Sequence, residues 1–170
     1  MTLRIRQAGS LWHEAARRVL RLLIAAALSA GPAGIVHGQV SRVVSSDPAT
    51  GLAIGGYDPM SYFVAGQPKK GTDLYEFEWQ GASWRFVSEA NRYAFARDPA
   101  VYAPGFGGHG ALAMAQGTAN AGNPAIWVIY KNALYLFFST EARRKWLLAP
   151  ETYIDRAQKK WPNVMAGLSR

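Results

Sequence analysis

The chain has 170 residues, of which 49% are hydrophobic and 12% aromatic, and it contains no cysteine. This length and composition suit one compact domain and exclude disorder of the whole chain. The lack of cysteine excludes disulfides, thiolate metal sites, iron–sulfur clusters and a cysteine nucleophile. Nineteen basic against 11 acidic residues give a net charge of +8, which raises the question of a nucleic acid or an anionic membrane as partner.

The beginning of the chain has the pattern of an export signal. Several arginines precede the apolar run 22–28, and small residues follow as far as Gly38. This order predicts a signal peptide over residues 1–38, cleaved between Gly38 and Gln39. The run is shorter than the about 20 apolar residues of a membrane anchor. The pair Arg17-Arg18 also partly matches a twin-arginine signal, so the export route stays open. We expect a periplasmic or secreted protein whose residues 1–38 meet the export machinery.

Much of the positive charge belongs to this signal. Removal of residues 1–38 takes away five arginines and one glutamate, which leaves 14 basic and 10 acidic residues and a net charge of +4 over 132 residues. The longest remaining basic run, Arg143-Arg144-Lys145, suits the later turns of a helix. We therefore expect no nucleic acid partner. His109 is the one histidine of the mature chain.

The first half of the mature chain predicts a hairpin followed by a helix. Residues 39–50 are polar and predict a flexible segment before a single domain at 51–165. Residues 51–55 predict a short strand, and Asp58-Pro59 predicts the start of a helical turn. Alternating runs at 75–79 and 83–87 predict a β-hairpin with one aromatic face packed in the core. Ser88 is a typical N-cap for a helix that Asp98-Pro99 ends.

The second half repeats the order of hairpin and helix. Residues 105–110 contain four glycines in six positions, and a short helix is expected over 111–116. A second hairpin is predicted at 125–130 and 133–138, then a helix from Ser139 to Leu148 and a last helix from Pro150 to about Lys160. These elements predict an α+β fold with a small, mainly antiparallel sheet built from two hairpins and helices packed on one side.

Candidate chemistry in the mature chain centres on His109. No Ser-His-Asp order or nucleophile elbow is present, and Asp58, before Pro59, is typical of turns, so no catalytic residue is predicted. His109 lies in the glycine-rich loop, where backbone can approach a ligand closely. Imidazole together with a thioether suits copper; the candidate thioethers are those of Met60, Met114 and Met165. The alternative is a tight, ligand-free turn.

Several spaced motifs resemble exported YHS-domain proteins over residues 51–164. The matching positions are Gly56–Phe63, the hairpin Phe77–Phe86, Ser88–Phe95, Asp98-Pro99, Tyr102–Pro104, Gly107-Gly108, Trp127 and Lys160–Pro162. The resemblance implies a YHS-like fold. In metal-handling YHS modules cysteines stand where this chain has Val87 and Asn91, and exported relatives often have a cysteine at the position of Gly110. The resemblance therefore implies a scaffold that has lost thiolate metal transfer and keeps either a site at His109 or a ligand pocket.

These observations predict a non-catalytic exported binding module. Its pocket is expected to be formed by six residues: Tyr57, Asp58, Tyr62, Gly108, His109 and Trp127. The ligand is expected to be a small molecule or a metal ion such as copper, held in the second case by His109. One alternative is a redox or metal-assisted enzyme that uses His109 as base or ligand. Another is a structural or partner-binding domain without a ligand, in which the loop at His109 packs solidly.

Overall fold

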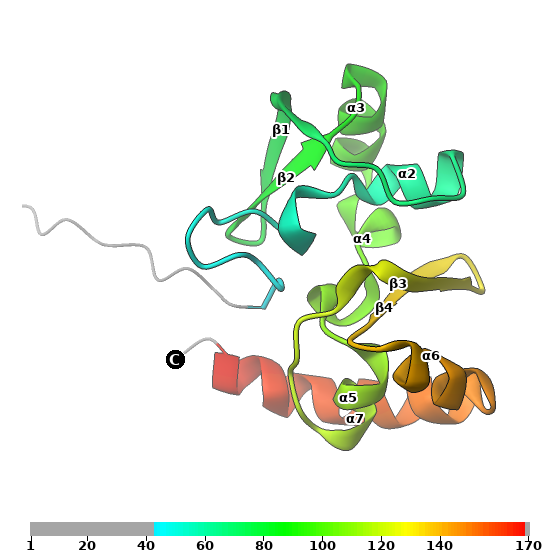
Figure 1. Cartoon of the computed structure of the whole chain (residues 1–170). Coiled ribbons are helices and arrows are strands. Elements are labelled where there is room, and N and C mark those ends of the chain that lie inside the picture. Colours follow the sequence, from blue (N-terminus) through cyan, green and yellow to red (C-terminus); the bar gives the residue numbers. More distant parts are fainter. Residues whose placement is uncertain (1–42, 169–170) are drawn as a thin grey trace, which may run out of the picture. The chain divides into compact units, whose positions relative to one another are not determined.

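The computed structural model describes residues 43–168, so the predicted export signal and its cleavage site lie outside the described residues. The described residues belong to one compact unit. As predicted, the fold is α+β, with two antiparallel hairpins and six α-helices in the described part (Figure 1). In chain order the elements are α2 Pro59–Val64, β1 Thr72–Trp79, β2 Ala82–Phe86, α3 Glu89–Arg97, α4 Pro99–Tyr102, α5 Ala111–Gln116, β3 Asn123–Tyr130, β4 Ala133–Phe137, α6 Thr140–Leu147 and α7 Pro150–Leu168, with 3₁₀ turns at Ile54–Gly56 and Gly105–Gly108.

Capping side chains begin the helices where the sequence predicts. Ser88 accepts a hydrogen bond from the backbone N–H of Asn91 at 3.2 Å, and Ser139 accepts one from Ala142 at 3.1 Å. Each serine satisfies one of the backbone donors that the first turn of a helix leaves unpaired. The starts of α3 and α6 are thereby confirmed.

The first hairpin packs its aromatic face against α3, which confirms that prediction. The ring of Phe95 from α3 is fully buried, and four rings of the hairpin surround it with centroid distances of 5.1 to 6.2 Å. These four rings are Phe77, Trp79, Trp84 and Phe86. The face is continuous because alternate residues of paired strands point to the same side.

The second hairpin is buried on both faces and separates two cores. On one face Leu134 and Leu136 join the aromatic core of the first hairpin. On the other face Tyr135 and Phe137 pack around Trp146 of α6, with ring centroids 5.2 and 5.4 Å from the indole. The two hairpins form separate two-stranded sheets rather than one. The 3₁₀ turn at Ile54–Gly56 contacts both β2 and β3, so this turn and a shared core join the two hairpins in place of strand pairing.

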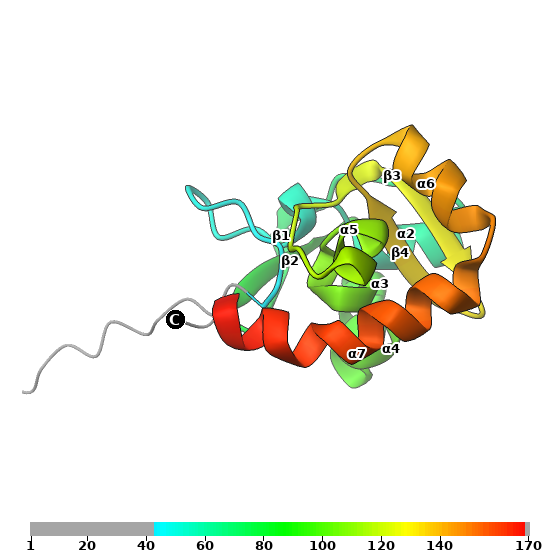
Figure 2. The same ribbon diagram turned by 90° about the horizontal axis from the view of Figure 1, so that it is seen from below.

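Helix α7 is longer than predicted. The sequence suggests an end before Trp161-Pro162, but the helix continues through Pro162 to Leu168, so that prediction is wrong. Ala157, Trp161 and Val164 recur at helical spacing and pack beside α5, as Figure 2 shows for the two helices. This packing outweighs the hydrogen bond that proline cannot donate. No helix within residues 43–168 combines the length and hydropathy needed to cross a membrane.

The segment ahead of α2 also differs from the sequence-based prediction. Residues 51–55 form isolated bridges at Leu52 and Ala53 and then a 3₁₀ turn, so the predicted strand is wrong. A regular strand is interrupted there because Ile54 and Gly55 both have positive φ, at 42° and 62°. Within the segment predicted to be flexible, Val44 is 1% exposed, so the packed part of the chain begins before residue 51.

Candidate functional site

The six predicted pocket residues fall into two groups in the structure. Tyr57, Asp58, Tyr62 and Trp127 belong to the region where α2 meets the two hairpins. Gly108 and His109 lie in the glycine-rich loop, and of the six only His109 lines the cavity described below. The sequence places all six in one pocket; the structure shows two distinct environments.

Asp58 is a buried carboxylate that joins three chain segments. It is 0% exposed. Its Oδ1 accepts from the N–H of Met60 at 2.8 Å, and its Oδ2 accepts from the N–H of Val87 at 3.0 Å and from Nδ2 of Asn91 at 2.7 Å. These bonds satisfy a carboxylate that would otherwise be costly to bury. Asp58 therefore holds the start of α2 against the junction of β2 and α3.

The two positions at which the YHS resemblance implies lost cysteines, Val87 and Asn91, thus both contact Asp58. The backbone N–H of one and the side-chain amide of the other donate to the same carboxylate oxygen. At the place where the cysteines would stand, the structure therefore has a hydrogen-bonded carboxylate. The bond to Asp58 gives the Asn91 side chain a structural role that its position in a helix does not reveal.

Tyr62 connects α2 to the second hairpin. Its side chain is 1% exposed, and its hydroxyl donates to the carbonyl of Pro124 at 2.9 Å. The ring meets that of Trp127 edge to face at a centroid distance of 5.3 Å. Burial, and then the negative charge that Tyr57 and Asp58 carry when ionised, raise the pKa of Tyr62 well above its ordinary value. At neutral pH Tyr62 is a fixed hydrogen-bond donor.

Tyr57 carries a cation on its ring. The Lys70 ammonium lies 4.3 Å from the ring centroid and donates to the carbonyl of Gly55. A cation over a tyrosine face is held by the ring quadrupole. Tyr57, Asp58, Tyr62 and Trp127 are therefore engaged in packing and hydrogen bonds within the fold.

Gly108 and His109 are held by the segment that precedes the first hairpin. The carbonyl of Gly107 accepts from the N–H of Ser45 at 2.7 Å. Gly107 has a φ of 62°, and a Cβ there would lie 2.0 Å from the carbonyl oxygen of Val43. Only glycine permits this close approach of two backbones. The glycines of the loop thus bring residues 43–45 alongside His109.

A cavity of about 580 Å³ opens beside His109. Most of its lining is apolar or small, and its polar side chains come from three neighbouring residues and the histidine. The lining residues are Val44, Ser45, Ser46, Asp47, Pro48, Gly51, His109, Ala121 and Leu168. His109 is 7% exposed, pairs with Ala121 through an isolated antiparallel bridge, and has its ring 6.2 Å from that of Trp161.

The one carboxylate of this lining is committed to its own turn. Oδ1 of Asp47 accepts from the N–H groups of Ala49 and Thr50, each at 2.9 Å, and from the Thr50 hydroxyl at 3.1 Å. The bonds from Thr50, followed by that from Ala49, hold the pKa of Asp47 below its ordinary value. Asp47 closes the turn and contributes a negative charge to the lining of the cavity.

Two of the three candidate thioethers for a copper site are buried in other parts of the core, whereas Met165 belongs to α7, between Trp161 and Leu168 in sequence. Met60 is buried in the core of the first hairpin, and Met114 is buried between α5 and α7. Among residues 43–168, no three histidine, cysteine, aspartate or glutamate side chains lie close enough together to hold a metal ion. His109 is thus the candidate ligand that the cavity offers.

Sequence reasoning missed most of the cavity. Val44, Ser45, Ser46 and Pro48 belong to the segment interpreted as flexible, and Leu168 lies beyond the predicted end of the last helix. The glycines at 107 and 108 were the available signal, because a pair of glycines often marks the close approach of another segment. The sequence does not identify which segment approaches.

Comparison of the chain with protein-family models, curated proteins and solved structures finds no match. The resemblance to exported YHS-domain proteins stays a prediction. The functional argument therefore depends on the geometry described above.

Proposed function

We propose that this protein is an exported, non-catalytic binding domain that takes a small molecule in the cavity beside His109. The observation that carries the proposal is the cavity itself, whose volume of about 580 Å³ falls within the range of small-molecule sites. An apolar lining with a few polar groups is typical of such sites. His109 supplies a ring that is aromatic and polar at once, so it can orient a ligand that has both kinds of surface.

A substitution that fills the cavity tests this function. Ala121 is an exposed lining residue, and Ala125 is an exposed alanine outside the cavity that serves as a matched control. The probe is 1-anilinonaphthalene-8-sulfonate, which fluoresces in apolar sites. We expect Ala121→Trp to weaken probe binding at least about tenfold, the loss that about 1.4 kcal/mol produces, and Ala125→Trp to leave it unchanged. Equal affinities of the two variants would overturn the proposal.

Copper is the second candidate ligand, because imidazole suits it and His109 lines the cavity. A titration with Cu²⁺ tests whether His109 binds copper, with binding measured by the quenching of the fluorescence of nearby Trp161. We expect His109→Gln to weaken Cu²⁺ binding, and Met60→Leu, which is not a lining residue, to leave it unchanged. An affinity for Cu²⁺ that is the same with and without the imidazole would exclude His109 as a ligand.

A further inference from the structure

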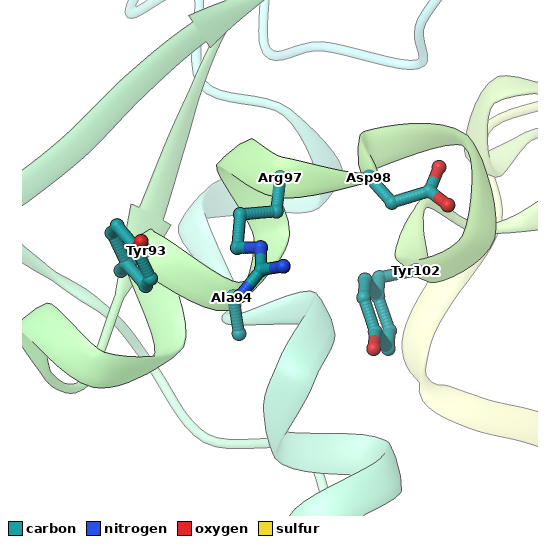
Figure 3. A pocket seen from close by; sticks show the side chains of 5 residues that line it. All are labelled: Tyr93, Ala94, Arg97, Asp98 and Tyr102. Carbon is teal, nitrogen blue, oxygen red and sulfur yellow. The ribbon is translucent and has the colours of Figure 1, made fainter.

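A second hollow, outside the cavity at His109, lies between helices α3 and α4. It has a volume of about 420 Å³ and is lined by Tyr93, Ala94, Arg97, Asp98 and Tyr102 (Figure 3). Four of these five side chains are polar or aromatic. A volume of this size suits a ligand of one or a few rings.

Two tyrosine rings flank the hollow. Tyr93 is 62% exposed, which is unusual for so large a ring. Tyr102 is held from behind, because its ring meets Phe63 edge to face at a centroid distance of 5.8 Å. In Figure 3 the Arg97 side chain projects between the two tyrosines, and its guanidinium lies 6.0 Å from the centroid of the Tyr93 ring. The hollow thus has an aromatic ring on each side of the Arg97 guanidinium, which is a hydrogen-bond donor.

The two charged groups of the hollow do not neutralise each other by direct contact. Among the ion pairs of residues 43–168, none includes Arg97 or Asp98, and both side chains are exposed. The guanidinium has five N–H donors and the carboxylate only acceptors. Their formal charges sum to zero, so the lining of the hollow carries no net charge and offers both donors and acceptors.

From these features we propose that the hollow binds a neutral polyhydroxyl ligand, in chemical terms a saccharide. A hydroxyl group both donates and accepts, so neighbouring hydroxyls can pair with Arg97 and with Asp98 at the same time. The aliphatic C–H face of a sugar ring is weakly positive and matches the negative face of a tyrosine ring. Tyr93 supplies the exposed face, and Tyr102 supplies the anchored one. The proposal does not depend on the function assigned to the cavity at His109.

Chemical shift mapping of amide resonances tests the proposal, with maltotriose, cellotriose and triacetylchitotriose as probes and benzoate as an anionic comparison. We expect at least one of the three saccharides to shift the resonances of residues 93–102 at millimolar concentration. Tyr93→Ala should weaken that binding about three- to tenfold, and Tyr93→Phe should retain it, because the ring supplies the contact.

A matched control comes from the same kind of contact elsewhere in the chain. Arg156 lies 6.0 Å from the Tyr153 ring centroid, the same spacing as between Arg97 and Tyr93, but outside the hollow. Arg97→Gln should weaken saccharide binding, and Arg156→Gln should not. The proposal is overturned if none of the three saccharides shifts residues 93–102, if benzoate alone does so, or if Arg97→Gln and Arg156→Gln bind equally.

Discussion

At the scale of single residues, the buried carboxylate of Asp58 accepts three hydrogen bonds and joins three chain segments. An asparagine at this position has only one oxygen for three donors, so in either orientation its own amide would face at least one N–H group that now donates to Asp58. An unsatisfied buried donor costs about 1 to 3 kcal/mol, and bonds to a charged group are stronger than neutral ones. We therefore expect Asp58→Asn to lower the free energy of unfolding by about 2 to 4 kcal/mol, measured by urea denaturation.

Asp98 provides a control, because it also precedes a proline but is exposed and its side chain makes no capping hydrogen bond to the helix that follows. Asp98→Asn should change the free energy of unfolding by less than about 0.5 kcal/mol. Similar losses in the two variants would mean that the Asp-Pro turn, and not the buried network, determines the effect.

The raised pKa of Tyr62 predicts a pH dependence of stability. The folded state keeps the phenol protonated, whereas the unfolded chain ionises it near pH 10. The stabilisation is complete below that pH and decreases as the pH rises above it, because only the unfolded state gains by losing the proton. Tyr62→Phe should therefore be less stable than wild type by about 1 kcal/mol at pH 8, through loss of the bond to Pro124, and the difference should shrink above pH 10. Urea denaturation of both proteins at pH 8 and above pH 10 measures this difference in the free energy of unfolding. A difference that is the same at both pH values would contradict the prediction.

At the scale of elements, the contact between α5 and α7 explains the length of the last helix. Ala157 of α7 is 0% exposed and packs against Met114 and Ala115 of α5. A larger side chain there forces the two helices apart, which costs about 1 to 3 kcal/mol. We expect Ala157→Leu to lower the thermal unfolding midpoint. Ala166→Leu, at an exposed position of the same helix, should leave it nearly unchanged. Equal midpoints for the two variants would show that α7 does not pack on α5 in solution.

At the scale of the whole described unit, strand β4 is shared by two cores. Leu136 faces the core that contains Phe95, and Phe137, the next residue, faces the core that contains Trp146. Because one strand supplies both, the two cores should unfold together. Leu136→Ala, at a fully buried position, should cost about 2 to 5 kcal/mol. It should lower the protection of amides in both α3 and α6 to the same degree in hydrogen exchange. If amide protection decreased in α3 alone, the two hairpins would unfold independently, and the prediction would be wrong.

Local signals explain which elements could be predicted. The hairpins and the helix starts depend on residues that are close together in the chain, so the sequence is enough to place them. The signals are the alternation in 75–87 and 125–137, the serines at 88 and 139, and the proline after Asp58. The end of α7 could not be predicted, because its continuation through Pro162 depends on packing against α5, which is distant in sequence.

The sequence by itself determined the two hairpins and the starts of the helices that follow them, the α+β class, the absence of thiolate chemistry and the position of His109 in a glycine-rich loop. Only the tertiary structure decided which residues surround that histidine. Asp58 and Tyr62 bury their polar groups in hydrogen bonds to other segments, whereas the cavity is lined by residues 44–48 and Leu168. The physical reason is that Gly107 lets a distant backbone approach closely, and a glycine permits such contact without specifying its partner.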